Sequence, residues 1–173
     1  MAEKNPWLDV DKQGRNLHIG QFLTFIIIRL GNALKSNVTR RYLADFGLSV
    51  PEWRLLAMTM RFEPVRFSEL VAKSGMDKGQ ASRTLQMLTK RGWVASRAAA
   101  RTAGRASARA SEGATPVILT VTPKGRKLYR TVLPVAQRNQ ARLLRLMTRE
   151  ERRVLHGIVK KLFAAIGHSD PLA

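Results

Sequence analysis

The chain has 173 residues, 45% of them hydrophobic, which fits one globular domain with a sizeable core. Lysine and arginine number 31 against 12 aspartate and glutamate, so the formal net charge is +19. Because such a charge opposes compaction, it indicates a polyanionic partner, with nucleic acid first and an anionic membrane surface second. The lack of cysteine excludes disulfides, a thiol switch and cysteine-ligated metal sites.

The basic excess is concentrated away from the first third of the chain. Residues 1–60 hold eight basic and five acidic residues, a local +3, whereas residues 61–110 hold eleven and three and residues 111–173 hold twelve and four, each +8. The polar start is no signal peptide, and the most apolar run, residues 22–28, is far shorter than the roughly 20 residues of a membrane span. We therefore expect a cytoplasmic protein with no membrane partner.

The first helical pattern runs from residue 17 to about residue 40, and residues 22–28 are apolar on nearly every side. Two interpretations stay open: a helix at the centre of the core, or a helix shared with a second subunit. A second helix is expected from Ser49, which can cap it, with Pro51 in its first turn and Pro64 as its end.

Two short helices with a tight link follow. Ser68 is expected to cap the first, which Gly75 closes, and Asp77 to cap the second, which covers residues 78–91 and stops at Gly92. The second helix has Ala81, Leu85 and Leu88 on one face, while its polar residues point elsewhere: Lys78, Gln80, Ser82, Arg83 and Gln86.

Residues 93–97 and 117–121 alternate like strands, and Thr122 then caps a long helix. Pro134 is expected to kink that helix or divide it in two. A capping box from Thr148 to Glu151 opens the final helix, whose apolar residues form one broad face.

This order predicts a mainly α fold with a small β-hairpin wing: a winged helix-turn-helix with N- and C-terminal dimerisation helices. We expect a helical dimerisation region at 17–45 and 123–167, and a DNA-binding region at 50–122. A flexible wing tip at 98–114 and mobile termini at 1–16 and 168–173 complete the organisation. Packing the first and last helices together, within one chain and across two, would bury both apolar faces.

The segments RFSELVAKSGMDKGQASRTLQMLTKRGWV (66–94) and ILTVTPKGRKLY (118–129) resemble the MarR family of bacterial transcription regulators. The resemblance covers about residues 17–167. It implies a homodimer that binds pseudo-palindromic double-stranded DNA, and a small, often aromatic and anionic inducer that binds between the dimerisation helices and the DNA-binding lobe. One departure is that residues 98–111 lack the acidic residue of the family's usual Asp-x-Arg wing pair.

The resemblance implies that the helix after Asp77 enters the major groove. Gln80 and Arg83 are then expected at base edges, and Lys78 and Ser82 at mixed or phosphate positions. An alternative for Arg83 is a half-buried residue that ties the helix to the wing. Ser68 is either a cap alone or also places backbone amides near a phosphate. Arg97, with Arg66 and Lys73, is either a phosphate contact or a solvated charge.

The wing carries an arginine at every fourth position: Arg97, Arg101, Arg105 and Arg109. Like charges at this spacing repel on a helix, and no apolar stripe accompanies them. We therefore predict a hairpin tip that orders on DNA and places Arg101, Arg105 and Arg109 on the minor groove or phosphates. The alternative is an idle, solvated insertion.

Catalytic signatures are missing from the sequence: there is no phosphate loop, nucleophile motif or paired carboxylates, and the three histidines lack metal-ligand spacing. We expect neither an enzyme nor a metal or cofactor site. The sequence predicts a ligand-responsive regulator, usually a repressor. A low-specificity architectural DNA-binding protein is the alternative, because a net charge of +19 favours binding through neutralisation of DNA phosphates. Arg15, His18 and Trp53 are weak candidates for an inducer crevice.

Overall fold

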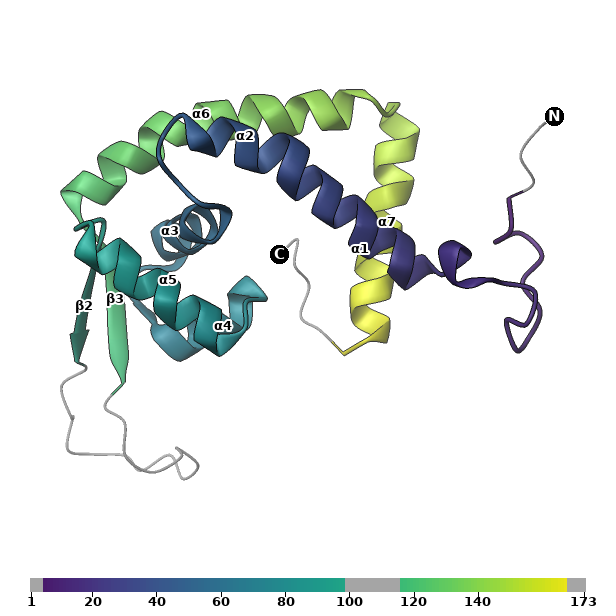
Figure 1. The fold of residues 1–173 in the computed structure, drawn as a ribbon, viewed down its shortest axis with the longest axis horizontal. Coiled ribbons are helices and arrows are strands. Elements are labelled where there is room, and N and C mark those ends of the chain that lie inside the picture. The colour runs from purple at the N-terminus through teal and green to yellow at the C-terminus, as the bar shows by residue number, and fades with distance from the viewer. Residues whose placement is uncertain (1–4, 99–115, 168–173) are drawn as a thin grey trace.

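The computed structural model describes residues 5–98 and 116–167, in which helices dominate and three short strands form one sheet (Figure 1). The elements in chain order are η1 (Ile19–Gln21), α1 (Leu23–Leu34), η2 (Lys35–Thr39), α2 (Arg40–Ala44), α3 (Val50–Phe62), β1 (Val65–Arg66), α4 (Phe67–Ser74), α5 (Lys78–Lys90), β2 (Val94–Ala98), β3 (Val117–Val121), α6 (Pro123–Arg145) and α7 (Arg149–Ala165). The predicted fold class, a winged helix-turn-helix with flanking helices, is confirmed.

Helix starts follow the local capping signals. Ser49, Asp77, Thr122 and Thr148 each accept a hydrogen bond from the backbone N–H three residues on. These bonds satisfy N–H groups that have no partner inside the helix, so a short polar side chain fixes where each helix begins.

The sheet is antiparallel with strand order β1-β3-β2. The predicted hairpin β2–β3 is present, with Val94 opposite Val121 and Ala98 opposite Val117. The sequence does not predict the two-residue strand β1, in which Val65 pairs with Leu119. Two residues carry no detectable alternation, so only tertiary pairing reveals this strand.

Two long helices tolerate local irregularities. The helix from Leu23 to Ala44 is continuous and widens to a π-helical turn at η2. Of the two alternatives predicted at Pro134, division of the long helix is wrong, because α6 runs through it as one 23-residue helix. A kink at this position stays a prediction. Pro134 is exposed, so the carbonyl group that loses its N–H partner there can be hydrated.

The core has two parts that meet at Trp93 and Leu128. One lies under the winged helix and includes Leu56, Leu70 and Leu119. The other joins the α2–α3 region to α6 through its buried residues, which are Tyr42, Leu43, Leu48, Val132 and Ala136. The second part fixes the winged helix-turn-helix lobe against the long helices.

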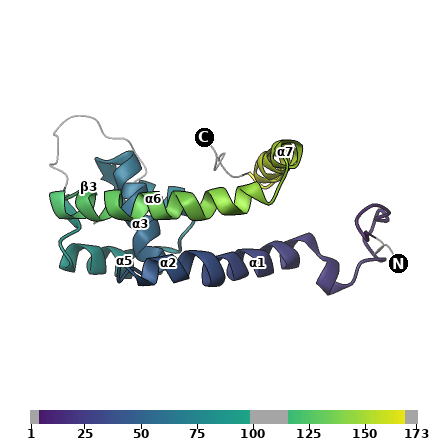
Figure 2. The same cartoon turned by 90° about the horizontal axis from the view of Figure 1, so that it is seen from above.

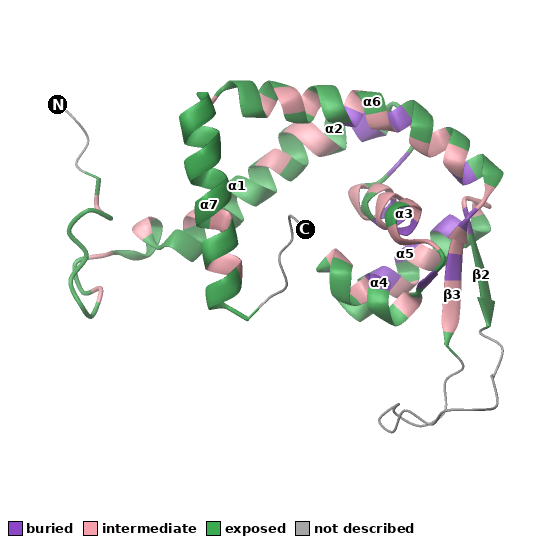
Figure 3. Ribbon diagram, turned by 180° about the vertical axis from the view of Figure 1, so that it is seen from behind, coloured by how far each residue is buried: buried purple, intermediate pink, exposed green. Residues whose placement is uncertain are grey.

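The apolar faces of α1 and α7 remain largely uncovered. The two helices overlap in Figure 1 but lie apart in Figure 2, so the predicted packing within one chain is wrong. Both are mostly exposed in Figure 3, and Ile28 is 62% and Ile158 49% exposed. No helix among residues 5–98 and 116–167 is long and apolar enough to cross a membrane.

Candidate nucleic-acid interface and cleft

The N-terminal turn of α5 presents polar side chains to solvent. The Asp77 carboxylate accepts a hydrogen bond of 2.8 Å from the backbone N–H of Gln80, which fixes the start of the helix. Ala81, Thr84 and Leu88 are buried, whereas Lys78 and Gln80 are exposed. The buried face fixes the rotation of the helix, and the opposite face is free to meet a partner.

Arg83 is also exposed, so the alternative that it is a half-buried tie to the wing is wrong. Its guanidinium group lies back along the helix, 3.4 Å from where a side chain on Gly79 would begin. Ser82 is half-buried beside it. Lys78, Gln80 and Arg83 thus share the solvent side of the first turns, with Ser82 at its edge.

The start of α4 differs from the prediction. Ser68 is exposed in the first turn of the helix, and the residue at the cap position is Arg66, which makes no side-chain capping bond. Ser68 is therefore not the cap, because β1 leads directly into the helix at Phe67. Lys73 lies 3.9 Å from Glu69 and 4.7 Å from the centre of the Phe62 ring.

The described part of the wing ends at Ala98 on one side and resumes at residue 116. Arg97 is exposed on β2 and pairs with Ile118 in the sheet. Arg101, Arg105 and Arg109 lie outside the described residues.

Arg91 connects the end of α5 to the adjacent lobe, a connection that the sequence does not predict. Its guanidinium donates a hydrogen bond of 2.7 Å to the Gly47 carbonyl, lies 3.5 Å from the Glu52 carboxylate and stacks 4.7 Å from the Trp93 ring centre. Glu52 is buried and also accepts hydrogen bonds from the backbone N–H and hydroxyl of Ser49. The C-terminal end of α5 is thereby fixed to the start of α3.

Glu63 performs a similar role at the base of the wing. One carboxylate oxygen accepts a hydrogen bond of 2.6 Å from the backbone N–H of Val121, and the other lies 2.6 Å from the Arg126 guanidinium. The side chain is only 12% exposed. This carboxylate links the end of α3, the last residue of β3 and the first turns of α6, so it fixes the direction of the hairpin.

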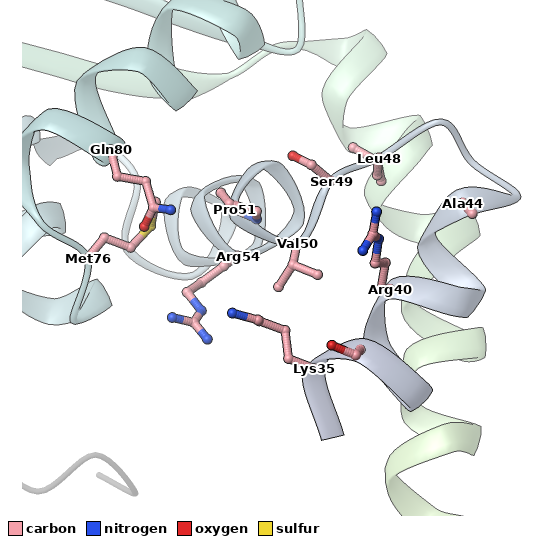
Figure 4. A pocket seen from close by; sticks show the side chains of 11 residues that line it. Lys35, Arg40, Ala44, Leu48, Ser49, Val50, Pro51, Arg54, Met76 and Gln80 are labelled. Carbon is pink, nitrogen blue, oxygen red and sulfur yellow. The ribbon is translucent and has the colours of Figure 1, made fainter. Parts of the chain in front are cut away.

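A cleft of about 480 Å³ lies between the N-terminal helices and the helix-turn-helix (Figure 4). One side comes from η2, α2 and the start of α3, and the other from Met76 and Gln80. Lys35, Arg40 and Arg54 extend into this space, and the residues that line it include no acid.

The cleft chemistry favours a small anion with an apolar body. Three cations at one cleft repel each other, and an anion would relieve that repulsion. Leu48, Val50 and Met76 supply apolar surface. The π-helical turn η2 places Lys35 at this site, and such turns are frequent at functional sites.

The three weak candidates for an inducer crevice, Arg15, His18 and Trp53, do not lie at one site. Trp53 stacks on Tyr129 with ring centres 5.5 Å apart and lines an adjoining cavity of about 430 Å³, which shares Lys35 and Arg54 with the cleft. His18 instead lines a hollow beside Trp7, and Arg15 lines neither cavity. The described residues contain no group of three metal-ligating side chains.

Comparisons with known proteins agree with this geometry. Residues 46–106 match the sequence model of the MarR family. A MarR/EmrR family transcriptional regulator from Acinetobacter sp. superposes with a TM-score of 0.72 at 22% identity, covering 87% of this chain and 99% of that one. No curated relative matches the chain.

Two further solved structures carry ligands. S. aureus MepR in complex with DNA has a TM-score of 0.68 at 12% identity and covers 83% of this chain and 98% of its own. A MarR family protein of Mycobacterium tuberculosis in complex with p-aminosalicylic acid has a TM-score of 0.59 at 23% identity, with 82% and 98% covered. At these identities the likeness establishes the fold.

Proposed function

We propose that this chain, whose residues 46–106 match the MarR family model, is a homodimeric, sequence-specific winged helix-turn-helix repressor that a small anionic ligand releases from double-stranded DNA. The observation that carries the proposal is the orientation of α5. Its apolar face is buried in the winged-helix core, and the first turns present Lys78, Gln80 and Arg83 to solvent.

The side chains on α5 match the chemistry of base edges. Gln80 can pair bidentately with adenine and Arg83 with guanine, while Lys78 and Ser82 reach phosphates or flanking bases. Arg97 at the wing extends this basic surface, and backbone amides in the exposed first turn of α4, near Ser68, offer a further phosphate contact. We assign the sequence-specific part of binding to Gln80 and Arg83.

The wing arginines are assigned to the DNA backbone and minor groove. No acidic residue occurs from residue 98 to residue 111, which includes Arg101, Arg105 and Arg109, and the narrow minor groove has the most negative potential of the duplex. Removing one cation from a phosphate should reduce the slope of log affinity against log salt by about 0.9. Replacing all three arginines by alanine should flatten that slope. An unchanged slope would show that the wing does not contact DNA.

The dimer is supported by the uncovered apolar faces of α1 and α7. Exposed Ile28, Leu30, Leu155 and Ile158 lie on two helices that do not cover each other within the chain. A second copy can bury both surfaces at once. The two α5 helices would then face half-sites about one helical turn apart, so footprinting should show an inverted repeat.

The cleft is assigned to the releasing ligand. Lys35, Arg40 and Arg54 favour a carboxylate, and the apolar lining favours an aromatic ring, a class that includes the p-aminosalicylic acid bound by the M. tuberculosis protein. Gln80 lines the cleft and also stands on the DNA-reading face, so an occupied cleft can withdraw it from DNA. Salicylate is the probe to use, and Lys35→Ala should weaken its binding.

The alternative is an architectural protein that coats DNA with little base preference, which the +19 charge keeps plausible. Competition separates the two. Affinity for the upstream region of the chain's own gene is measured with and without excess random duplex. A specificity ratio of roughly 10³ or more supports the regulator, and a ratio near one supports the coating protein.

The matched variants are Gln80→Ala and Arg83→Ala. Each should cost about 1–3 kcal/mol on the preferred sequence and much less on random DNA. Equal losses on both DNAs would show that the α5 face contacts only the backbone and would exclude base reading by these residues.

A further inference from the structure

The long helix α6 carries a second basic surface that the DNA-reading face does not include. Its 23 residues contain no aspartate or glutamate. Six of its basic side chains are exposed, namely Lys124, Lys127, Arg130, Arg138, Arg142 and Arg145. We call this set the α6 stripe.

Helical periodicity gathers these charges on one side. At about 100° per residue, five of the six fall within a sector of roughly 60°, and only Arg130 lies outside it. Val132 and Ala136, which are buried against the α2–α3 region, project from the opposite side. The stripe therefore faces outward, away from the core that fixes α6.

The stripe matches the dimensions of a duplex backbone. From Lys124 to Arg145 the helix rises about 32 Å at 1.5 Å per residue. Double-stranded DNA carries one negative charge per roughly 1.7 Å of its axis. A helix of this length can thus contact several phosphates at once, and no specific base needs to be read.

The stripe and the reading face lie on different sides of the lobe. Helix α3 contacts both α5 and α6, and Figure 1 shows α6 starting at the upper end of the wing strands and running along the edge remote from α4. A duplex held against the first turns of α5 therefore leaves the outer side of α6 uncovered.

Most of the stripe is uncommitted to other contacts. Lys124 donates a hydrogen bond of 2.9 Å to the Arg91 carbonyl, and the neighbouring Arg126 pairs with Glu63. Among the described residues, no acid lies within 4.0 Å of the charged groups of Lys127, Arg138, Arg142 or Arg145.

A membrane surface is a poorer partner for this helix. Helices that lie on a bilayer insert an apolar face beside their cations. The apolar side of α6 is used inside the protein at Val132 and Ala136, and Leu144 is its single exposed large hydrophobic residue, too little for an inserting face. Between the cations the exposed residues include Thr131, Pro134 and Gln137.

We propose that the α6 stripe binds the phosphate backbone of a second DNA duplex, so that one operator-bound dimer holds two DNA segments. This contact is additional to the reading of the operator and does not depend on base specificity at α5. Its failure and the failure of the proposed function are therefore distinguishable.

The test is a bridging assay with the full-length protein. Operator duplex is immobilised and saturated with protein, and a labelled duplex of random sequence is then added at several salt concentrations. Arg138→Gln/Arg142→Gln should weaken capture of the second duplex at least about tenfold at 0.1 M salt, since each phosphate that is no longer neutralised lowers the salt slope by about 0.9. Operator affinity should stay unchanged.

Two controls accompany this variant. Arg138→Lys/Arg142→Lys keeps the charge and should restore capture, because a backbone contact needs a cation and no fixed geometry. Lys12→Gln/Arg15→Gln removes the same net charge from the N-terminal segment and should leave capture intact. Equal thermal stability of all variants excludes a folding defect.

Capture that is unchanged in the Arg138→Gln/Arg142→Gln variant overturns the proposal. It is also overturned if that variant loses binding to vesicles of anionic lipid while duplex capture persists. A Gln80→Ala variant that keeps its full operator affinity and still captures the random duplex would support the stripe and count only against the base-reading assignment.

Discussion

Gly125 is the position where a single methyl group should be most disruptive. It lies in the first turn of α6, where the helix passes directly over the end of the β2–β3 hairpin. A Cβ placed there would lie 2.8 Å from Val121 Cγ1 and would overlap the carbonyl oxygen of Trp93. The Trp93 carbonyl oxygen already accepts a hydrogen bond from the backbone N–H of Thr122, so it cannot move away without breaking this hydrogen bond.

The expected cost of Gly125→Ala follows from these close approaches. Inserting a methylene into a packed site costs about 1–3 kcal/mol, and a clash with backbone belongs at the upper end. The higher helix propensity of alanine offsets this cost by up to about 1 kcal/mol. We expect a net loss of about 2 kcal/mol in the free energy of unfolding, or roughly 4–8 °C in Tm for a chain of this size.

Urea and thermal unfolding at one fixed protein concentration measure this loss, since the Tm of a dimer depends on concentration. Gly157→Ala is the matched control. No atom lies within 4 Å of its added Cβ in α7, so it should be neutral or stabilise by up to about 1 kcal/mol. A Gly125→Ala protein within about 0.5 kcal/mol of the parent would refute the claimed close approach of α6 to the hairpin.

Three further outcomes can be measured. Ile158→Asp should give a monomer in sedimentation experiments because it places a charge on the exposed apolar face of α7; an intact dimer would exclude that face. Glu63→Ala should lower the free energy of unfolding by about 2 kcal/mol because a part-buried backbone N–H loses its charged acceptor, and an unchanged urea midpoint would contradict this. Hydrogen bonds from the backbone and hydroxyl of Thr148 lower the pKa of the Glu151 carboxyl below 4.5. The ionised Glu151 carboxylate therefore contributes fully to the stability of α7 above about pH 4.5, and this contribution is lost as the pH falls through the lowered pKa. An NMR titration of Glu151 measures that pKa.

Local signals predict most of the fold. Ser49, Asp77, Thr122 and Thr148 each begin a helix because a cap depends on a side chain and a backbone group three residues apart. Ser68 offers the same signal without becoming a cap, because pairing of β1 with β3 carries the chain into α4 before Ser68 is reached. Sheet pairing over this sequence distance has no local signature.

The candidate site is predictable on α5 and less so elsewhere. The amphipathic pattern of residues 78–90 fixes which side is buried, so the exposure of Gln80 follows from sequence, whereas only the structure decides between the two alternatives for Arg83. The cleft cations Lys35, Arg40 and Arg54 come from separate elements, and their meeting depends on how α2 and α3 pack. The hydrogen bond from Arg91 to the Gly47 carbonyl joins residues 44 positions apart, so no local sequence pattern predicts it either.

The shared position of Gln80 has a thermodynamic consequence. In the proposed function, one side-chain amide would have to serve both an occupant of the cleft and an adenine, which it cannot do at the same time, so the two binding equilibria would be linked. Linkage is reciprocal: whatever factor the occupant removes from DNA affinity, DNA must remove from the affinity for the occupant. Protein already seated on its preferred sequence should therefore respond to inducer at higher concentration than protein free in solution.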